Sequence, residues 1–99
     1  MSRPKHYWFG ISKGMICRYT QIKNGESRQE KNWTKAIEDA LEAARGLENG
    51  EYRVEAIRLV LLDKKLTQPG AADALHYSER TIRRWIEGFV NDVGRRAGY

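Results

Sequence analysis

The 99-residue sequence is poor in the residues that cross-link small proteins or bind metals. Cys17 is the only cysteine, so the chain cannot form an intramolecular disulfide or build a zinc site from cysteines. It lies in an apolar helical stretch, where a buried structural thiol is expected rather than a nucleophile. The two histidines, His6 and His76, are far apart and lack the spacing of metal ligands. We therefore expect no metal ion and no other cofactor.

Long apolar runs and signatures of catalysis are also missing. The longest aliphatic run covers residues 59–62, whereas a bilayer span needs ~20 apolar residues. The basic N-terminus is not followed by an apolar segment of signal-peptide length. No glycine-rich loop has the strand–loop–helix context that phosphate binding requires. These absences predict a cytoplasmic protein that has no enzymatic activity and does not contact a membrane.

The composition does support one small folded domain. Apolar residues make up 40% of the chain and include three tryptophans and five tyrosines, which is enough for a single core. The net charge of +5 is uneven, with +6 in residues 1–35, −4 in residues 36–63 and +3 in residues 64–99. This pattern favours contact with a polyanion at the two ends. Mutual neutralisation of the segments within the fold is the alternative.

Apolar residues recur at three- and four-residue steps in the first two thirds of the chain, which predicts amphipathic helices. After a basic tail at residues 1–5, a first helix is expected over residues 6–19, with Tyr7, Trp8, Ile11, Met15, Ile16 and Tyr19 on its apolar face. Residues 20–32 are expected to form a loop, with helix resuming near Ser27. Thr34 is a further candidate cap.

Two more helices follow in this region, because the same spacing continues. The next apolar face comprises Ala36, Ile37, Ala40, Leu41, Ala44 and Leu47, and ends at Gly46 or at residues 49–50. Glu38, Asp39 and Glu42 give this helix an acidic outer face. A third helix is expected over residues 51–65, with core positions Tyr52, Val54, Ile57, Leu61 and Leu62. No stretch alternates with a period of two, so no sheet is expected.

The C-terminal third contains the pattern most directly tied to a function. Thr67 can cap a short helix that has Pro69 in its first turn. His76 interrupts the pattern at a position where glycine is common, and Ser78 can cap the next helix. The packing positions of two crossing helices are filled by Ala71, Ala72, Leu75, Tyr77, Ile82, Trp85, Ile86, Phe89, Val90 and Val93. This is the pattern of a helix-turn-helix, whose second helix enters a DNA major groove.

The expected fold is all-α, a small bundle of about five helices in one domain. Residues 1–65 form a helical support region, residues 66–93 the helix-turn-helix, and residues 94–99 a basic C-terminal end. Double-stranded DNA is the expected partner. The residues that would read base edges are Glu79, Arg80, Thr81, Arg83 and Arg84. Those that would contact phosphates are Lys64, Lys65, Gln68 and Ser78. A generic helical hairpin is the alternative to DNA binding.

The segment LTQPGAADALHYSERTIRRWIEGFVNDVGRRAGY resembles the C-terminal region of phage late-transcription activators of the RinA/ArpU type. HYWFGISKGMICRY and the helix beginning NWTKAIEDAL are similar to this group as well. The resemblance is most specific at Ala72, Leu75, Ser78, Thr81, Ile82 and Trp85. It implies a helix-turn-helix like region 4 of sigma factors, binding near a late promoter in a bacterial host cell, and contact with RNA polymerase.

Two other functions fit the same sequence. A small terminase subunit also uses a helix-turn-helix, and its assembly into a large ring would distinguish it. A protein-interaction module that docks through the acidic surface of residues 38–55 would not bind duplex DNA. The sequence leaves the operator, the direction of regulation and a homodimer open.

Overall fold

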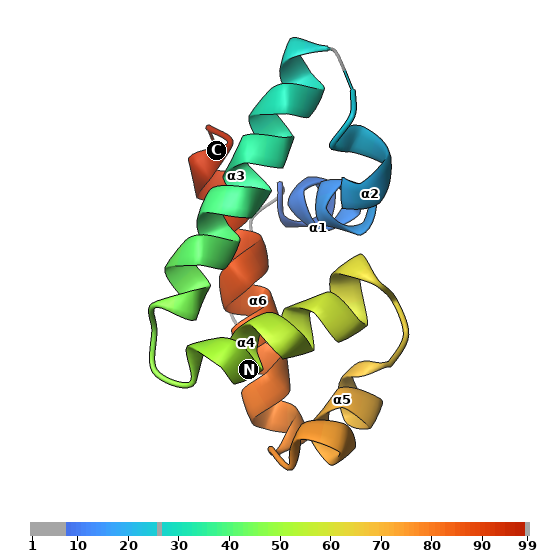
Figure 1. Ribbon diagram of the computed structural model, residues 1–99, viewed down its shortest axis with the longest axis vertical. Coiled ribbons are helices and arrows are strands. Elements are labelled where there is room, and N and C mark those ends of the chain that lie inside the picture. Colours follow the sequence, from blue (N-terminus) through green and yellow to red (C-terminus); the bar gives the residue numbers. More distant parts are fainter. Residues whose placement is uncertain (1–7, 26, 99) are drawn as a thin grey trace.

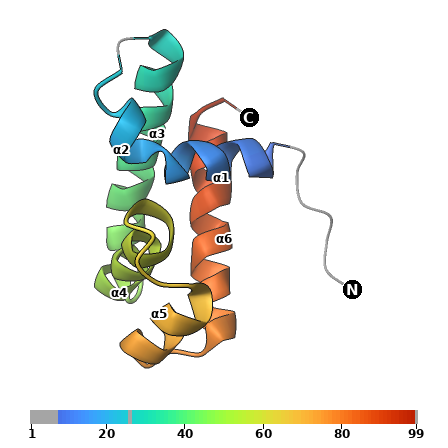
Figure 2. The same cartoon turned by 90° about the vertical axis from the view of Figure 1, so that its right-hand side faces the viewer.

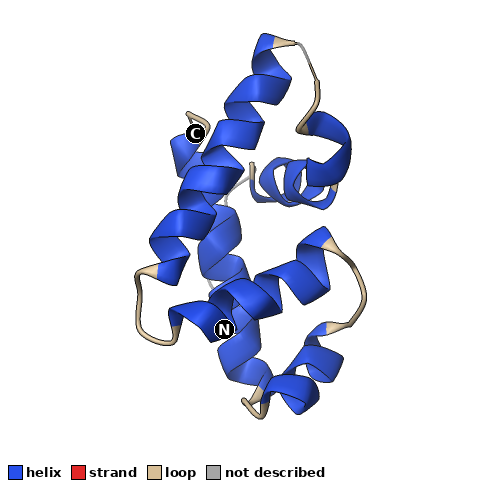
Figure 3. Ribbon diagram, in the orientation of Figure 1, coloured by secondary structure: helices blue, strands red, loops and turns tan. Residues whose placement is uncertain are grey.

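The computed structural model describes residues 8–25 and 27–98, and the secondary structure formed by these residues is entirely helical (Figure 3). The elements are α1 (Phe9–Cys17), α2 (Tyr19–Ile22), α3 (Arg28–Arg45), α4 (Gly50–Ile57), a π-helical segment η1 (Arg58–Leu62), α5 (Gln68–Leu75) and α6 (Glu79–Arg96). The predicted all-α class is confirmed. The basic tail, His6 and Tyr7 lie outside the described residues.

Helix α6 is the element around which the others assemble. It packs against α1, α3, α4 and α5, and in Figure 2 it runs from α5 at one end of the molecule to the crossing with α1 near the other. Apolar residues at three- and four-residue steps give it one continuous buried face, as predicted. The buried residues are Ile82, Trp85, Ile86, Phe89, Val90, Val93 and Gly94.

Helices α3 and α1 hold the C-terminal half of α6. Helix α3 lies antiparallel to α6 (Figure 1). The side-chain Nδ2 of Asn32 donates to the backbone carbonyl of Ala97 at 3.0 Å. Helix α1 crosses α6, and there the fully buried Ser12 hydroxyl donates to the Val90 carbonyl at 2.8 Å. This bond satisfies a buried polar group, so Ser12 occupies the core without the penalty of an unpaired hydroxyl.

The first predicted helix is only partly right. It breaks at Arg18, and a short second helix, α2, begins at Tyr19 in the region where the loop was expected to start. The buried residues of α1 are Phe9, Ser12 and Ile16, whereas Ile11 is 47% exposed. The prediction of Ile11 as a core residue was wrong because Ser12, which is polar, takes the inward position.

The start of α3 also differs from one of the two expectations. Ser27 caps the helix by accepting from the Glu30 N–H at 3.1 Å, so helix resumes near Ser27 as expected. Thr34 is no cap, because it lies within α3 and its hydroxyl donates to the Ile22 carbonyl at 3.3 Å. Helix α3 ends at Arg45 with Gly46 as its C-cap, which confirms one of the two predicted ends.

Two predicted core residues are exposed near the α3–α4 connection. Leu47 is 56% exposed, because the helix has already ended when the chain reaches it. Tyr52 is 50% exposed and lies against the ring of Tyr77, with centroids 5.5 Å apart. The predicted core positions Val54, Ile57 and Leu61 are buried. The helix expected over residues 51–65 leaves α-helical geometry after Ile57, continues as η1 and ends at Leu62.

The junction of α1 and α6 predicts opposite effects for two glycines of α6. A Cβ at Gly94 would collide with the Trp8 ring, whereas no described atom lies within 4 Å of a Cβ at Gly88. We expect Gly94→Ala to lower the free energy of unfolding by about 1–2 kcal/mol, since overpacking outweighs the gain in helix propensity. Gly88→Ala, the matched control, should raise it by up to ~1 kcal/mol. Urea denaturation measures both, and a more stable Gly94→Ala protein would show that Trp8 moves aside freely.

Candidate nucleic-acid interface

Local hydrogen bonds define the two helices of the predicted motif and the turn between them. Thr67 caps α5 by accepting from the Gly70 N–H at 3.3 Å, and Ser78 caps α6 by accepting from the Thr81 N–H at 3.2 Å. His76 adopts a left-handed conformation, with φ 61° and ψ 37°. This conformation ends α5 and turns the chain, as expected for that position. Three residues, 76–78, therefore connect α5 to α6.

Packing fixes the angle between α5 and α6. Ala71 and Ala72 of α5 are buried in the same core cluster as Ile82 of α6, and the two helices pack against each other. The edge of Tyr77 meets the ring of Trp85, with centroids 4.8 Å apart. Helix α4 contacts both α5 and α6, and the Arg53 guanidinium lies over the Trp85 ring, 5.3 Å from its centroid. Trp85 thus joins α4, the turn and α6, which makes the motif a three-helix unit.

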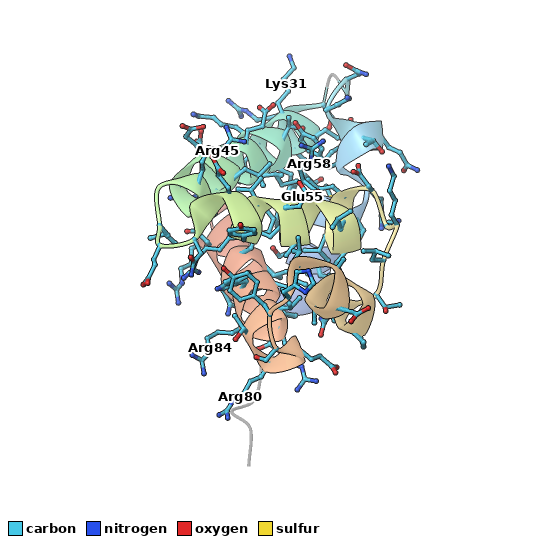
Figure 4. The ribbon with its side chains drawn as sticks, turned by 60° about the horizontal axis from the view of Figure 1, so that its bottom comes forward. Lys31, Arg45, Glu55, Arg58, Arg80 and Arg84 are labelled. Carbon is cyan, nitrogen blue, oxygen red and sulfur yellow. The ribbon has the colours of Figure 1, made fainter. Side chains whose placement is uncertain are left out.

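Arg80 and Arg84 occupy the face of α6 opposite its buried residues. They are one helical turn apart, both are exposed, and neither forms an ion pair or side-chain hydrogen bond with any described residue. Figure 4 shows both side chains extending from the first half of α6 into solvent. Arg45 and Arg58 lie in the opposite half of the same view. The arrangement presents two unpartnered guanidinium groups together, in a form that suits an external anion or base edge.

The other predicted base-reading residues are arranged differently. Arg83 lies about 100° around the helix from Arg84, and its Nη2 is 3.5 Å from Oε1 of Glu79. The Thr81 hydroxyl is 2.8 Å from Oγ of Ser78, so it takes part in the helix cap. Glu79, Thr81 and Arg83 therefore already have intramolecular partners, unlike Arg80 and Arg84. The sequence places all three arginines close together and does not show that Arg83 has an intramolecular partner while Arg80 and Arg84 have none among the described residues.

The predicted phosphate-contacting residues fall into two groups. Lys64 and Lys65 are exposed in the connection between η1 and α5, and Lys64 has a positive φ of 53°. Gln68 is the first residue of α5, at the same end of that helix. Ser78 lies beyond the other end, separated from Gln68 by the length of α5, about 12 Å. The structure thus places the lysines and Gln68 in one region and Ser78 at the start of α6.

The exposed face of α6 continues beyond the predicted set. Gly88 and Arg95 are exposed and Asn91 is half-buried, and their spacing from Arg84 places all three on the same side of the helix. The signal was present in the sequence as steps of four, four, three and four from residue 80 to residue 95. It was missed because base reading was expected only in the first turns of the helix.

Other kinds of site find little support in residues 8–25 and 27–98. No three His, Cys, Asp or Glu side chains in this part of the chain are grouped as metal ligands. No helix there has the length and hydrophobicity of a membrane span. Cys17 is half-buried and packs against the core.

Comparison with known protein families adds independent support for the motif. Residues 50–94 match the family described as a homeodomain-like domain. The matched range contains α4, η1, α5 and most of α6, and so includes both helices of the motif and the turn between them. The match supports a helix-turn-helix DNA-binding protein. It does not extend to the phage late-transcription activators. Comparison with curated proteins and with solved structures finds no match.

The position of Trp85 predicts a large loss of stability when its ring is removed. The side chain is 6% exposed and contacts Tyr77 and Arg53. Trp85→Ala should lower the free energy of unfolding by about 3–5 kcal/mol, measured by urea denaturation. Trp85→Phe keeps an aromatic ring at the crossing and should cost clearly less. Equal losses for the two variants would show that the aromatic packing does not hold the motif.

Proposed function

We propose that this protein is a sequence-specific DNA-binding transcriptional regulator that reads a duplex with the exposed face of α6. The observation that carries the proposal is the pair of unpartnered arginines, Arg80 and Arg84, on a helix-turn-helix whose opposite face is fully engaged in the core. Arginine makes bidentate contacts to guanine in the major groove. The packing of the bundle does not require these two exposed guanidinium groups, whereas an anionic duplex would bind both.

The other predicted site residues take supporting roles in this proposal. Glu79, Thr81 and Arg83 lie on the first turns of α6 and border the reading surface, where Glu79 can accept from cytosine and the Thr81 methyl can meet thymine. Lys64, Lys65, Gln68 and Ser78 contact phosphates. In homeodomains the connection between the first two helices and the C-terminal end of the third contact the DNA backbone. This precedent supports phosphate contacts from Lys64 and Lys65 and adds Arg95 at the C-terminal end of α6 as a further candidate.

We further propose that the protein activates late genes of a phage or prophage in the cytoplasm of a bacterial host, without enzymatic activity of its own. The support is the sequence resemblance. Its six most specific residues all lie in the motif, where Ser78 caps α6 and Ala72, Ile82 and Trp85 are buried. These roles fit the fold of such an activator. RNA polymerase and a second copy of this chain are the partners that this proposal adds for testing.

Replacing Arg80 and Arg84 together tests the proposed reading surface. A duplex is first selected from a random pool by the parent protein, and affinities are then compared by fluorescence anisotropy. Because each arginine makes base contacts, Arg80→Ala with Arg84→Ala should weaken binding of the selected duplex by about 1–3 kcal/mol per residue. The melting temperature should be unchanged, since both side chains are exposed.

The control removes the same charge from the opposite side. Arg45→Ala with Arg58→Ala lowers the net charge equally, but these residues lie far from Arg80 and Arg84 (Figure 4). It should reduce affinity only slightly, through the long-range field. Equal losses for the two double variants would mean that net charge alone drives binding. A parent protein that selects no duplex, even at low salt, would refute the proposed function.

A further inference from the structure

Gly88 has no packing role within the described structure. It lies in the middle of α6, is exposed, and has no described atom within 4 Å of the position that a Cβ would occupy. Glycine in a helix interior lowers stability by roughly 1 kcal/mol relative to alanine. Gly94 on the same helix is explained by the Trp8 ring, but nothing in the core explains Gly88. The residue weakens α6 without serving its packing.

The neighbours of Gly88 distinguish it from the other glycines with open space. Gly10 and Gly14 of α1 also have no described atom within 4 Å of their Cβ positions, but they lie on a helix without an arginine pair. Gly88 lies on the α6 face of Arg80, Arg84, Asn91 and Arg95, and these five positions fall within an arc of about 80°. It is therefore the one of these five positions that has no side chain to cover the helix backbone.

Asn91 lies about one turn after Gly88 on the same face, and its side chain has no hydrogen-bonding partner among the described residues. Its side chain is half-buried, and it makes no side-chain hydrogen bond or other polar contact to the described residues. An asparagine amide offers one donor and one acceptor group, the combination that pairs with the N6 and N7 edge of adenine. Its stem is short, so it reaches a base only if the helix comes close to the floor of the groove.

Relying on the proposed function, we infer that Gly88 is the point of closest approach between α6 and the major groove, and that Asn91 reads an adenine beside it. A missing side chain lets the helix backbone approach a ligand closely, which brings the short Asn91 within reach. Arg84 and Asn91 are about 10 Å apart along the helix axis. At 3.4 Å per base pair, this distance corresponds to about three base pairs. The recognised sequence should therefore contain a guanine and an adenine about three base pairs apart.

A groove beside Gly88 offers a different explanation for its small size. Gly88 also borders a depression of about 330 Å³ between α3, α4 and α6, which is lined in part by Ala40, Ala43 and Leu47. A protein side chain seated there would likewise require a glycine at the rim. The duplex is favoured over a protein because Gly88 is flanked along its helix by the two unpartnered arginines and Asn91. Ala43→Leu fills the depression without altering the α6 face and separates the two explanations.

The experiment compares the parent, Gly88→Ala, Asn91→Ala and Ala43→Leu on the duplex that the parent selects. Gly88→Ala should raise the melting temperature and yet weaken binding of that duplex by about tenfold, because the added methyl group holds the helix away from the bases. Asn91→Ala should also weaken binding by about tenfold and lose the preference for adenine at one position in a repeated selection. Ala43→Leu should bind like the parent.

Three results would overturn this inference while leaving the proposed function intact. They are undiminished affinity of Gly88→Ala, an unchanged base preference of Asn91→Ala, or a loss of affinity in Ala43→Leu as large as that in Gly88→Ala. A parent protein that selects no duplex overturns the proposed function and the inference with it. The opposite signs expected for stability and binding in Gly88→Ala exclude misfolding as the cause of weaker binding.

Discussion

Burial of one face of α6 against four other helices is the constraint on which the rest of the structure depends. Apolar residues on that face contact α4 and α5 near its start and α1 and α3 near its end. Since a helix has a fixed angular period, fixing the inward face also fixes which residues point outward. The orientation of Arg80 and Arg84 therefore follows from the packing of Ile82, Trp85 and Ile86. Core packing therefore determines which side chains of α6 are presented to solvent.

Small local interactions make that orientation unique. The left-handed conformation of His76 and the Ser78 cap set where α6 begins. A shift of the start by one residue would rotate the outward face by about 100°. Trp85 then holds the turn against α4 through Tyr77 and Arg53. Specific DNA recognition requires such rigidity, because a base contact is lost when a side chain is displaced by a fraction of its length.

The sequence predicts the parts of this structure in which spacing and chemistry agree. The apolar face of α6, the caps at Thr67 and Ser78 and the turn at His76 are all visible there, because each depends on neighbouring residues. The face predicted for the first helix was wrong at Ile11, since the inward position there is held by Ser12 through a bond to Val90, 78 residues away. No local pattern contains that information. Tyr52 was placed in the core because an aromatic ring that covers Tyr77 from outside has the same spacing as a buried one.

The candidate site shows the same limit more sharply. Proximity in sequence grouped Arg83 with Arg84, but the structure separates them by pairing Arg83 with Glu79. Conversely, the sequence assigned no role to Gly88 or Asn91. A glycine within a helix only lowers its stability, and an asparagine there is simply a polar residue. Their meaning depends on which face of α6 is covered. Because α6 packs against four helices, tilting it to relieve a poor fit with a bound duplex would cost buried contacts. Under the proposed function, the side chains of the exposed face then decide which duplex is bound. The missing side chain at Gly88 matters there as much as the side chains beside it.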